Sequence, residues 1–242
     1  MQYLPIPTHL VYLVLLSVFL LQAVGVVLMA ETRDPEPGAL ASLRVRLALP
    51  PTARQPFLVA APVLVAVWAL AGFYGSLGPA LVREVTGSDS LVLGGLALFT
   101  LAGSGAVTVV ALRSGAPRVA MFIGTLGLIL GVAVTLFGVD HGSTAALFTG
   151  TAIAGMGFGA GFQGAIRTVL PRAAVSERSG VLSLVYVVSY LAMGRPAVVA
   201  GFLVVHGGGL LRTAREYGVA IMALAGVALI GTALTGVRAA RR

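Results

Sequence analysis

Seven apolar runs constrain this chain more than any other feature. Each run is long enough to cross a bilayer, which takes roughly 20 helical residues. They lie near residues 9–30, 57–82, 91–112, 118–138, 145–168, 179–204 and 216–236. The runs are apolar on all sides and lack the alternation of barrel strands. Only 10% of the 242 residues are charged, against about 25% in a soluble domain. The sequence therefore predicts an all-α integral membrane protein with about seven transmembrane helices.

One long connection divides the series of runs. Residues 31–56 contain five prolines and seven charged residues, whereas the other connections are short. We predict a single transmembrane helix at 1–30, a cytoplasmic central linker at 31–56 and a six-helix bundle at 57–242. Within the linker, the stretch ALASLRVRL is a candidate amphipathic helix that lies on the membrane surface.

The arginines predict the orientation, because positively charged loops stay in the cytoplasm. All 16 basic residues are arginines. The long linker, every second connection after it and the C-terminal tail together hold twelve of them, and the other connections hold three. The chain is therefore expected in the plasma membrane as a multi-pass protein, with its N-terminus outside and its linker and C-terminus in the cytoplasm. Basic gaps between apolar runs are typical of membrane topology, so the net charge of +8 does not indicate nucleic-acid binding.

The sequence shows no nucleophile–base or metal-binding constellation. The chain has no cysteine, and its three histidines lie at the ends of apolar runs, without a triad-like or HExxH-like neighbourhood. We therefore predict no enzyme activity, no catalytic residue, no cofactor and no metal site. A rhodopsin needs a lysine for its Schiff base, and an animal-type receptor usually has a disulfide. The chain has neither lysine nor cysteine, which disfavours a non-transporting, receptor-like seven-helix protein.

The stretch GMGFGAG at 155–161 fits the G-x-G-x-x-G/A pattern of a dinucleotide-binding turn, and Glu177 follows it. That turn must follow a strand and open a helix, but these glycines lie inside a membrane-length apolar run. We interpret them as helix-packing residues, because small side chains let helix backbones approach closely in lipid. Gly155 and Gly159, and Gly157 and Gly161, are four residues apart. The helix is therefore expected to be central and to accept neighbours on two sides.

Several segments together resemble the C-terminal part of a major facilitator superfamily (MFS) transporter. The first run, ending in LMAETRDPEPG, resembles the sixth helix of that family and the start of its central loop. WALAGFYGSLGPALV resembles the seventh helix, the glycine-rich run the tenth and SERSGVLSLVYVVSYLAMGRPAVVAG the eleventh. GAVTVVALRSGAPR, at 105–118, is similar to the loop signature G-x-x-x-D-R-x-G-R-R, although its Asp is missing.

The resemblance implies a secondary active transporter of a small solute that works by alternating access, and efflux is the expected direction. It also implies an N-terminally truncated chain, inactive alone, that lacks five helices of the N-terminal half. Substrate in this family lies between the two halves. A proton is a possible coupling ion, but no carboxylate lies deep in a run. The alternative is a half-transporter that needs a partner chain. The bilayer and an unknown small molecule are the other expected partners.

Arg195 and two tyrosines are candidate substrate contacts in the sixth run. Arg195 lies near the middle of its span, where a charge is costly and often functional. Its alternative role is to reach outward or to bind carbonyls freed by Pro196. Tyr186 and Tyr190 are one turn apart and lie on roughly the opposite face. Tyrosines at such positions also serve as packing residues.

Three further candidates for the substrate cavity lie in other runs. Gln163 is the one strongly polar side chain deep in the glycine-rich run, so it needs a partner or a watery cavity. Trp68 and Tyr74 mark a candidate cavity side of the second run, with interfacial or packing roles as the alternative. Arg167 lies at the end of its run, where a cation suits the helix dipole, and we interpret it as structural.

Overall fold

The computed structural model describes residues 7–30 and 47–240, with side chains described at 9–30 and 47–233. The chain forms two compact units, residues 1–45 and 46–242. The first contains α1 (Pro7–Leu28), an uninterrupted helix in which no described side chain is buried. A helix that is apolar all round needs lipid or other protein around it.

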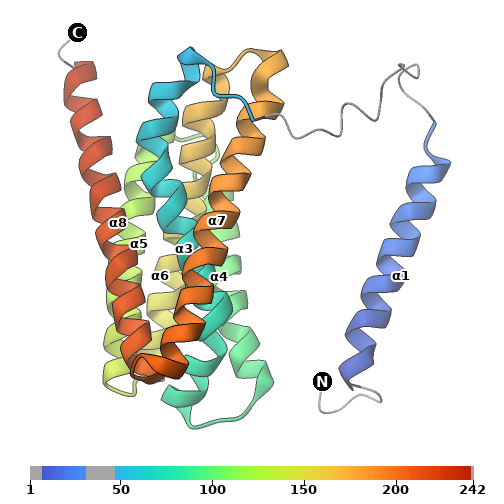
Figure 1. The fold of residues 1–242 in the computed structure, drawn as a ribbon, viewed down its shortest axis with the longest axis vertical. Coiled ribbons are helices and arrows are strands. Elements are labelled where there is room, and N and C mark those ends of the chain that lie inside the picture. Colours follow the sequence, from blue (N-terminus) through green and yellow to red (C-terminus); the bar gives the residue numbers. More distant parts are fainter. Residues whose placement is uncertain (1–6, 31–46, 241–242) are drawn as a thin grey trace. The chain divides into compact units, whose positions relative to one another are not determined.

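The second unit is a bundle of six long helices (Figure 1). They are α3 (Pro51–Thr86), α4 (Leu91–Ala111), α5 (Pro117–Asp140), α6 (Thr144–Val169), α7 (Arg178–His206) and α8 (Gly209–Ala240). Two short 3₁₀ turns, η1 (Leu170–Arg172) and η2 (Val175–Glu177), connect α6 to α7. The described residues contain no strand, and seven helices are long and apolar enough to cross a membrane. The predicted all-α chain with seven helices of spanning length is confirmed, and it suits a multi-pass membrane protein.

Two helices extend beyond the predicted runs. α3 begins at Pro51, so 51–56, expected in the linker, are helical. A proline suits the first helical turn, because its missing N–H has no intrahelical partner there. α8 begins at Gly209 rather than near 216, and its first turns are polar. Arg212 Nε donates to Glu216 Oε1 at 2.8 Å, which supports this start. The candidate amphipathic helix ALASLRVRL lies almost wholly outside the described residues.

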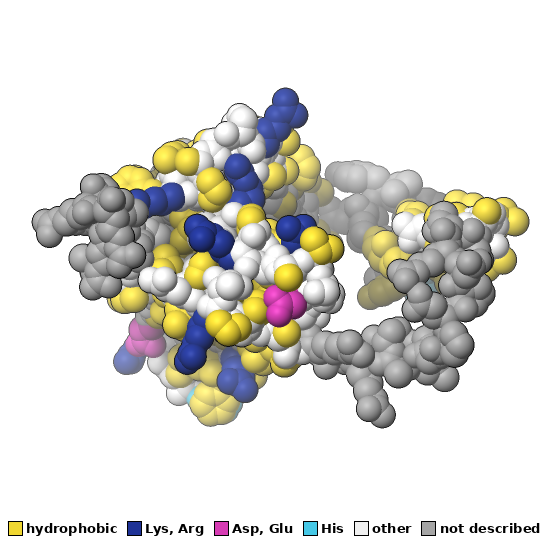
Figure 2. Space-filling view, turned by 90° about the horizontal axis from the view of Figure 1, so that it is seen from above, with side chains coloured by type: hydrophobic (Ala, Val, Ile, Leu, Met, Phe, Trp, Pro, Cys, Tyr) yellow, Lys and Arg dark blue, Asp and Glu magenta, His cyan; other side chains and the backbone are white. Residues whose placement is uncertain are grey.

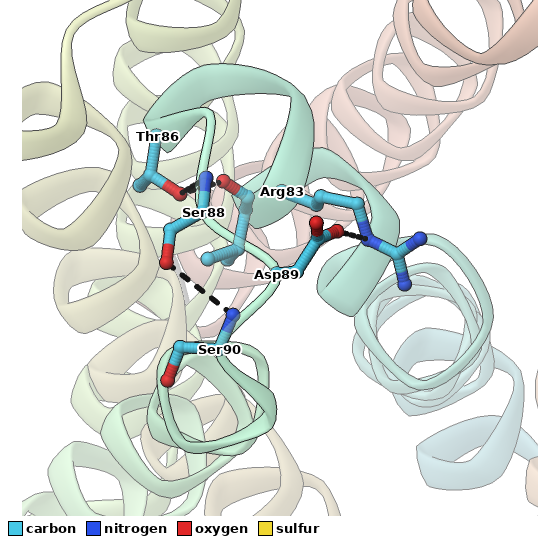
Figure 3. Close-up of polar contacts among 6 residues, drawn as sticks. Arg83, Thr86, Ser88, Asp89 and Ser90 are labelled. Carbon is cyan, nitrogen blue, oxygen red and sulfur yellow. Dashed lines mark hydrogen bonds and ion pairs between the residues drawn. The ribbon is translucent and has the colours of Figure 1, made fainter.

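The turn between α3 and α4 shows how one helix ends and the next begins (Figure 3). Gly87 adopts a left-handed conformation with φ of 63°, and its N–H donates to the carbonyl of Arg83 at 2.9 Å. The Thr86 hydroxyl accepts from the Ser88 N–H at 3.3 Å. Asp89 lies 3.5 Å from Arg83 Nε, but both side chains are well exposed. The contacts are those of a capped surface turn.

α3, rather than the glycine-rich α6, occupies the centre of the bundle. α3 contacts each of the other five long helices, whereas α6 contacts three of them, α3, α4 and α5. The hydroxyl of Tyr74 on α3 lies 2.8 Å from Thr135 Oγ1 on α5 and accepts from Thr151 Oγ1 on α6 at 3.1 Å. A buried polar group needs such partners where water is absent. The expectation of a central α6 thus failed because sequence spacing does not reveal how many neighbours a helix has.

Glycines let α6 pack closely against two neighbours. A Cβ on Gly157 would lie 2.5 Å from the backbone nitrogen of Leu128 on α5, and one on Gly159 would collide with the carbonyl of Gly105 on α4. A Cβ on Gly155 would also collide with α4, at Leu101. α6 therefore presents Gly155 and Gly159 to α4 and Gly157 to α5. Backbones can come this close only where side chains are missing.

One end of the bundle carries most of the described arginine side chains. The helices alternate in direction, so the start of α3 and the connections α4–α5 and α6–α7 lie together. We call this the basic end, because its described side chains include six arginines and one carboxylate, namely Arg54, Arg113, Arg118, Arg167, Arg172, Arg178 and Glu177. Figure 2 looks onto it and shows basic side chains spread over the surface. The opposite end holds three arginines and four carboxylates.

Candidate functional site

Aromatic rings from three helices meet on one side of the second unit. Trp68 on α3 lies 5.9 Å from Phe158 and 5.7 Å from Phe162 on α6, between ring centroids. Its ring is also 5.6 Å from that of Tyr190 on α7, and Tyr190 is stacked 6.4 Å from Tyr186. We call these five residues the aromatic face. Each separation falls in the range of favourable ring pairs.

The aromatic face is not covered by its own bundle. Tyr190 is 57% exposed and Tyr186 44%, and the other three rings are half-buried. Its residues lie in the inner turns of their helices, away from both ends of the bundle. Rings of this size are normally buried in a helix bundle, so the face is available to lipid, to another part of the protein or to a solute.

Two polar atoms beside these rings have no partner among the described residues. The indole Nε1 of Trp68 is buried, and so is the hydroxyl of Ser189 on α7. α3 and α7 run in the same direction, and a Cβ on Gly72 would meet the carbonyl of Met193. Trp68 lies one turn before Gly72 on α3, and Ser189 lies one turn before Met193 on α7, so both residues lie at the same level of the bundle. Unpartnered buried polar groups are rare and costly, so this level is a candidate position for a bound water or a ligand.

Tyr74 does not belong to the aromatic face. Its side chain is 2% exposed, and both of its described hydrogen bonds join helices inside the bundle. Trp68 and Tyr74 are six residues apart, which turns them about 120° from each other around α3. The two residues that we paired as one cavity side thus point in different directions.

Gln163 lies on α6 but is directed at α4. Its Nε2 donates to the carbonyl of Val109 at 3.1 Å, while its buried Oε1 has no partner among the described residues. Phe162, the preceding residue, contacts Trp68 instead. Gln163 therefore ties α4 to α6 and stands apart from the aromatic rings.

Arg195 is exposed, and it makes no side-chain hydrogen bond or ion pair within the part of the chain whose side chains the structure describes. It follows Tyr190 by five residues, which places the two side chains about 140° apart around α7. The neighbouring Pro196 and Val199 line a hollow of about 220 Å³ between α7 and α8. Arg195 itself does not line this hollow, and its position around α7 keeps it away from the tyrosines, as the sequence periodicity predicts.

Arg167 has a bonding role that the helix dipole alone did not predict. Its guanidinium donates to the carbonyl of Leu112 at 3.1 Å and to that of Gly115 at 2.7 Å. Arg118 similarly donates to the carbonyl of Thr232 on α8 at 2.9 Å. The two arginines thus fasten the α4–α5 connection and the start of α5 to α6 and α8. Both partners are main-chain carbonyls, which suits structural contacts.

Sequence reasoning missed Phe158, Phe162 and Ser189. The two phenylalanines are one turn apart beside Gly157, Gly159 and Gly161, so the spacing that drew attention to the glycines also contained them. Ser189 precedes Tyr190 directly, but one serine in an apolar run gives no signal by itself. Within the described residues, no group of His, Cys, Asp or Glu could hold a metal ion.

Comparisons with models of protein families, with curated proteins and with solved structures found no match to this chain.

Proposed function

We propose that this chain is the C-terminal part of a major facilitator transporter, and that the complete protein moves a small solute across the plasma membrane. The aromatic face is the observation that carries this proposal. It joins rings from α3, α6 and α7. By their order and by their resemblance, these three helices correspond to helices seven, ten and eleven of the family. In such transporters, solute binds between two halves near the middle of the bilayer. The aromatic face has the position and the exposure that one side of such a site requires.

Charge supports the proposed orientation. The basic end has far more arginines than carboxylates, while the opposite end is nearly balanced. Positive connections are retained in the cytoplasm, so we place the basic end there and the N-terminus outside. Among described residues, the carboxylates lie near helix ends or in connections. Coupling to protons, if it occurs, would therefore need carboxylates outside the described part of this chain.

Water access to the aromatic face tests the proposal. The chain has no cysteine, so single cysteines can be introduced without background once any cysteine elsewhere in the complete gene product is replaced. Tyr190→Cys and Leu130→Cys form a matched pair, because both side chains are 57% exposed and lie in the middle of α7 and α5. α5 carries no residue of the aromatic face, so Leu130 should face lipid.

A membrane-impermeant maleimide should label Tyr190→Cys in the complete gene product, both in intact cells and in inside-out vesicles. Labelling from both sides follows from alternating access, in which the site opens to each side in turn. Leu130→Cys should remain unlabelled, because thiols in lipid are not ionised. If Tyr190→Cys is not labelled from one or both sides, the site does not open to each side in turn, and the proposal fails. The 242-residue chain alone should not transport.

A further inference from the structure

We propose that the aromatic face binds an uncharged, planar aromatic solute that carries a hydrogen-bond acceptor, such as a carbonyl oxygen or a ring nitrogen. The inference rests on the proposed transport function and adds the chemical class of the solute. It follows from the shape of the ring cluster, from the position of the charged side chains and from two unpartnered polar atoms.

The ring cluster offers flat, polarisable surfaces. Tyr186 and Tyr190 are nearly parallel, with an interplanar angle of 28°, and both are partly exposed. Trp68 meets Phe158 and Phe162 edge to face, at 70° and 82°. A planar ring can stack on the tyrosines while its edge meets the indole, and both geometries are favourable. An aliphatic chain would gain no such contacts.

The charged side chains argue against an ionic solute. No described carboxylate lies beside the rings, since these carboxylates occur near helix ends or in connections. Arg195 is turned about 140° away from Tyr190 around α7. When the two halves close around a solute and exclude water, an ion without a charged partner costs far more than ring contacts return. An uncharged solute meets no such penalty.

The unpartnered indole N–H of Trp68 favours a solute with a hydrogen-bonding group. The Trp68 indole can only donate, so its partner must be an acceptor. The Ser189 hydroxyl is also unpartnered, whereas Ser76 and Ser104 donate to carbonyls four residues back. Tyr190 is the exposed member beside Trp68, and an exposed side chain changes rotamer within nanoseconds. Movement of Tyr190 would open the indole N–H to a solute acceptor.

Trp68 makes the inference directly measurable, because it is the only tryptophan in the chain. The test uses the complete gene product in nanodiscs, with any tryptophan outside this chain replaced, and follows Trp68 fluorescence on addition of acridone, a flat, uncharged molecule with a carbonyl. Three comparison probes keep the three-ring shape. Anthracene lacks the carbonyl, N-methylacridinium is a cation and anthracene-2-sulfonate is an anion.

Acridone should quench Trp68 saturably, and each comparison probe should bind about tenfold more weakly or worse. The Phe162→Ala/Tyr190→Ala double variant keeps Trp68 and should weaken acridone binding about tenfold. Phe202→Ala is the matched control, because Phe202 is an exposed ring on α7 that is stacked on His206 instead. It should leave acridone binding unchanged.

Equal quenching in the double variant and in the unmodified chain would show that the probe only enters lipid, and would overturn the inference. Absence of quenching by acridone, or tighter binding of either charged probe, would also overturn it. These failures are separate from failure of the transport proposal. If Tyr190→Cys is labelled from both sides while acridone does not bind, the transporter stands and only the solute class is wrong.

Discussion

Gly157 offers a sharp test of the close contact between α5 and α6. In Gly157→Ala, the added Cβ would lie 2.5 Å from Leu128 N, 2.7 Å from Gly127 C and 2.8 Å from Gly124 O. Favourable contacts between carbon atoms occur at about 3.5–4.0 Å. All three neighbours are backbone atoms, so the collision cannot be relieved by a rotamer change, and α5 and α6 must separate.

The expected cost can be worked out from two opposing effects. Overpacking of a tight interior costs about 1–3 kcal/mol, while alanine gains about 1 kcal/mol over glycine in helix propensity. Gly157→Ala should therefore lower the free energy of unfolding by up to about 2 kcal/mol. Gly226→Ala is the matched control, because a Cβ there meets nothing within 4 Å. This change should raise the free energy of unfolding by about 0.4–1 kcal/mol.

Denaturant titration in mixed micelles, followed by helix content, measures both variants against the unmodified chain. A difference of about 2 kcal/mol between the two substitutions is the predicted outcome, as the sum of the two opposite effects. If Gly157→Ala proves as stable as Gly226→Ala, backbone proximity does not hold α5 against α6, and the argument from glycine packing is refuted.

Three further predictions concern the core, the basic end and the orientation. Tyr74→Phe removes the hydroxyl that joins α3 to its two threonine partners, and should lower the free energy of unfolding by about 1 kcal/mol in the same titration. Arg167→Gln should speed proteolysis of the α4–α5 connection, whereas Arg172→Gln, with no described bond to that connection, should not. An impermeant maleimide should label His141→Cys in intact cells and Ser114→Cys only after permeabilisation, and the reverse pattern would invert the proposed topology.

The sequence predicted the helices well because a membrane span leaves a strong local signal. Length and apolar composition located all seven, and the four-residue spacing of the glycines indicated two packing sides. Helix ends were less predictable, since the first turns of α3 and α8 are polar or proline-rich. Hydropathy registers the lipid-facing part of a helix and not its extension beyond the bilayer.

The aromatic face could not have been predicted as a unit. Trp68 and Tyr190 are 122 residues apart, and only the packing of α3 beside α7 brings their rings to 5.6 Å. Periodicity did separate Arg195 from the tyrosines, and it would also have separated Trp68 from Tyr74. It could not show that Tyr74 faces two threonines, because that requires knowing which helices surround α3.

Solute flux shows directly whether the complete protein is a transporter. Proteoliposomes that contain the complete gene product can be exposed to a pool of uncharged, cationic and anionic small solutes, with accumulation followed by mass spectrometry. We expect saturable accumulation of at least one solute above that in empty liposomes, and its loss in Trp68→Ala but not in Phe202→Ala, as the transport proposal requires. Flux of every solute at the level of empty liposomes, or flux that Trp68→Ala leaves unchanged, would contradict it.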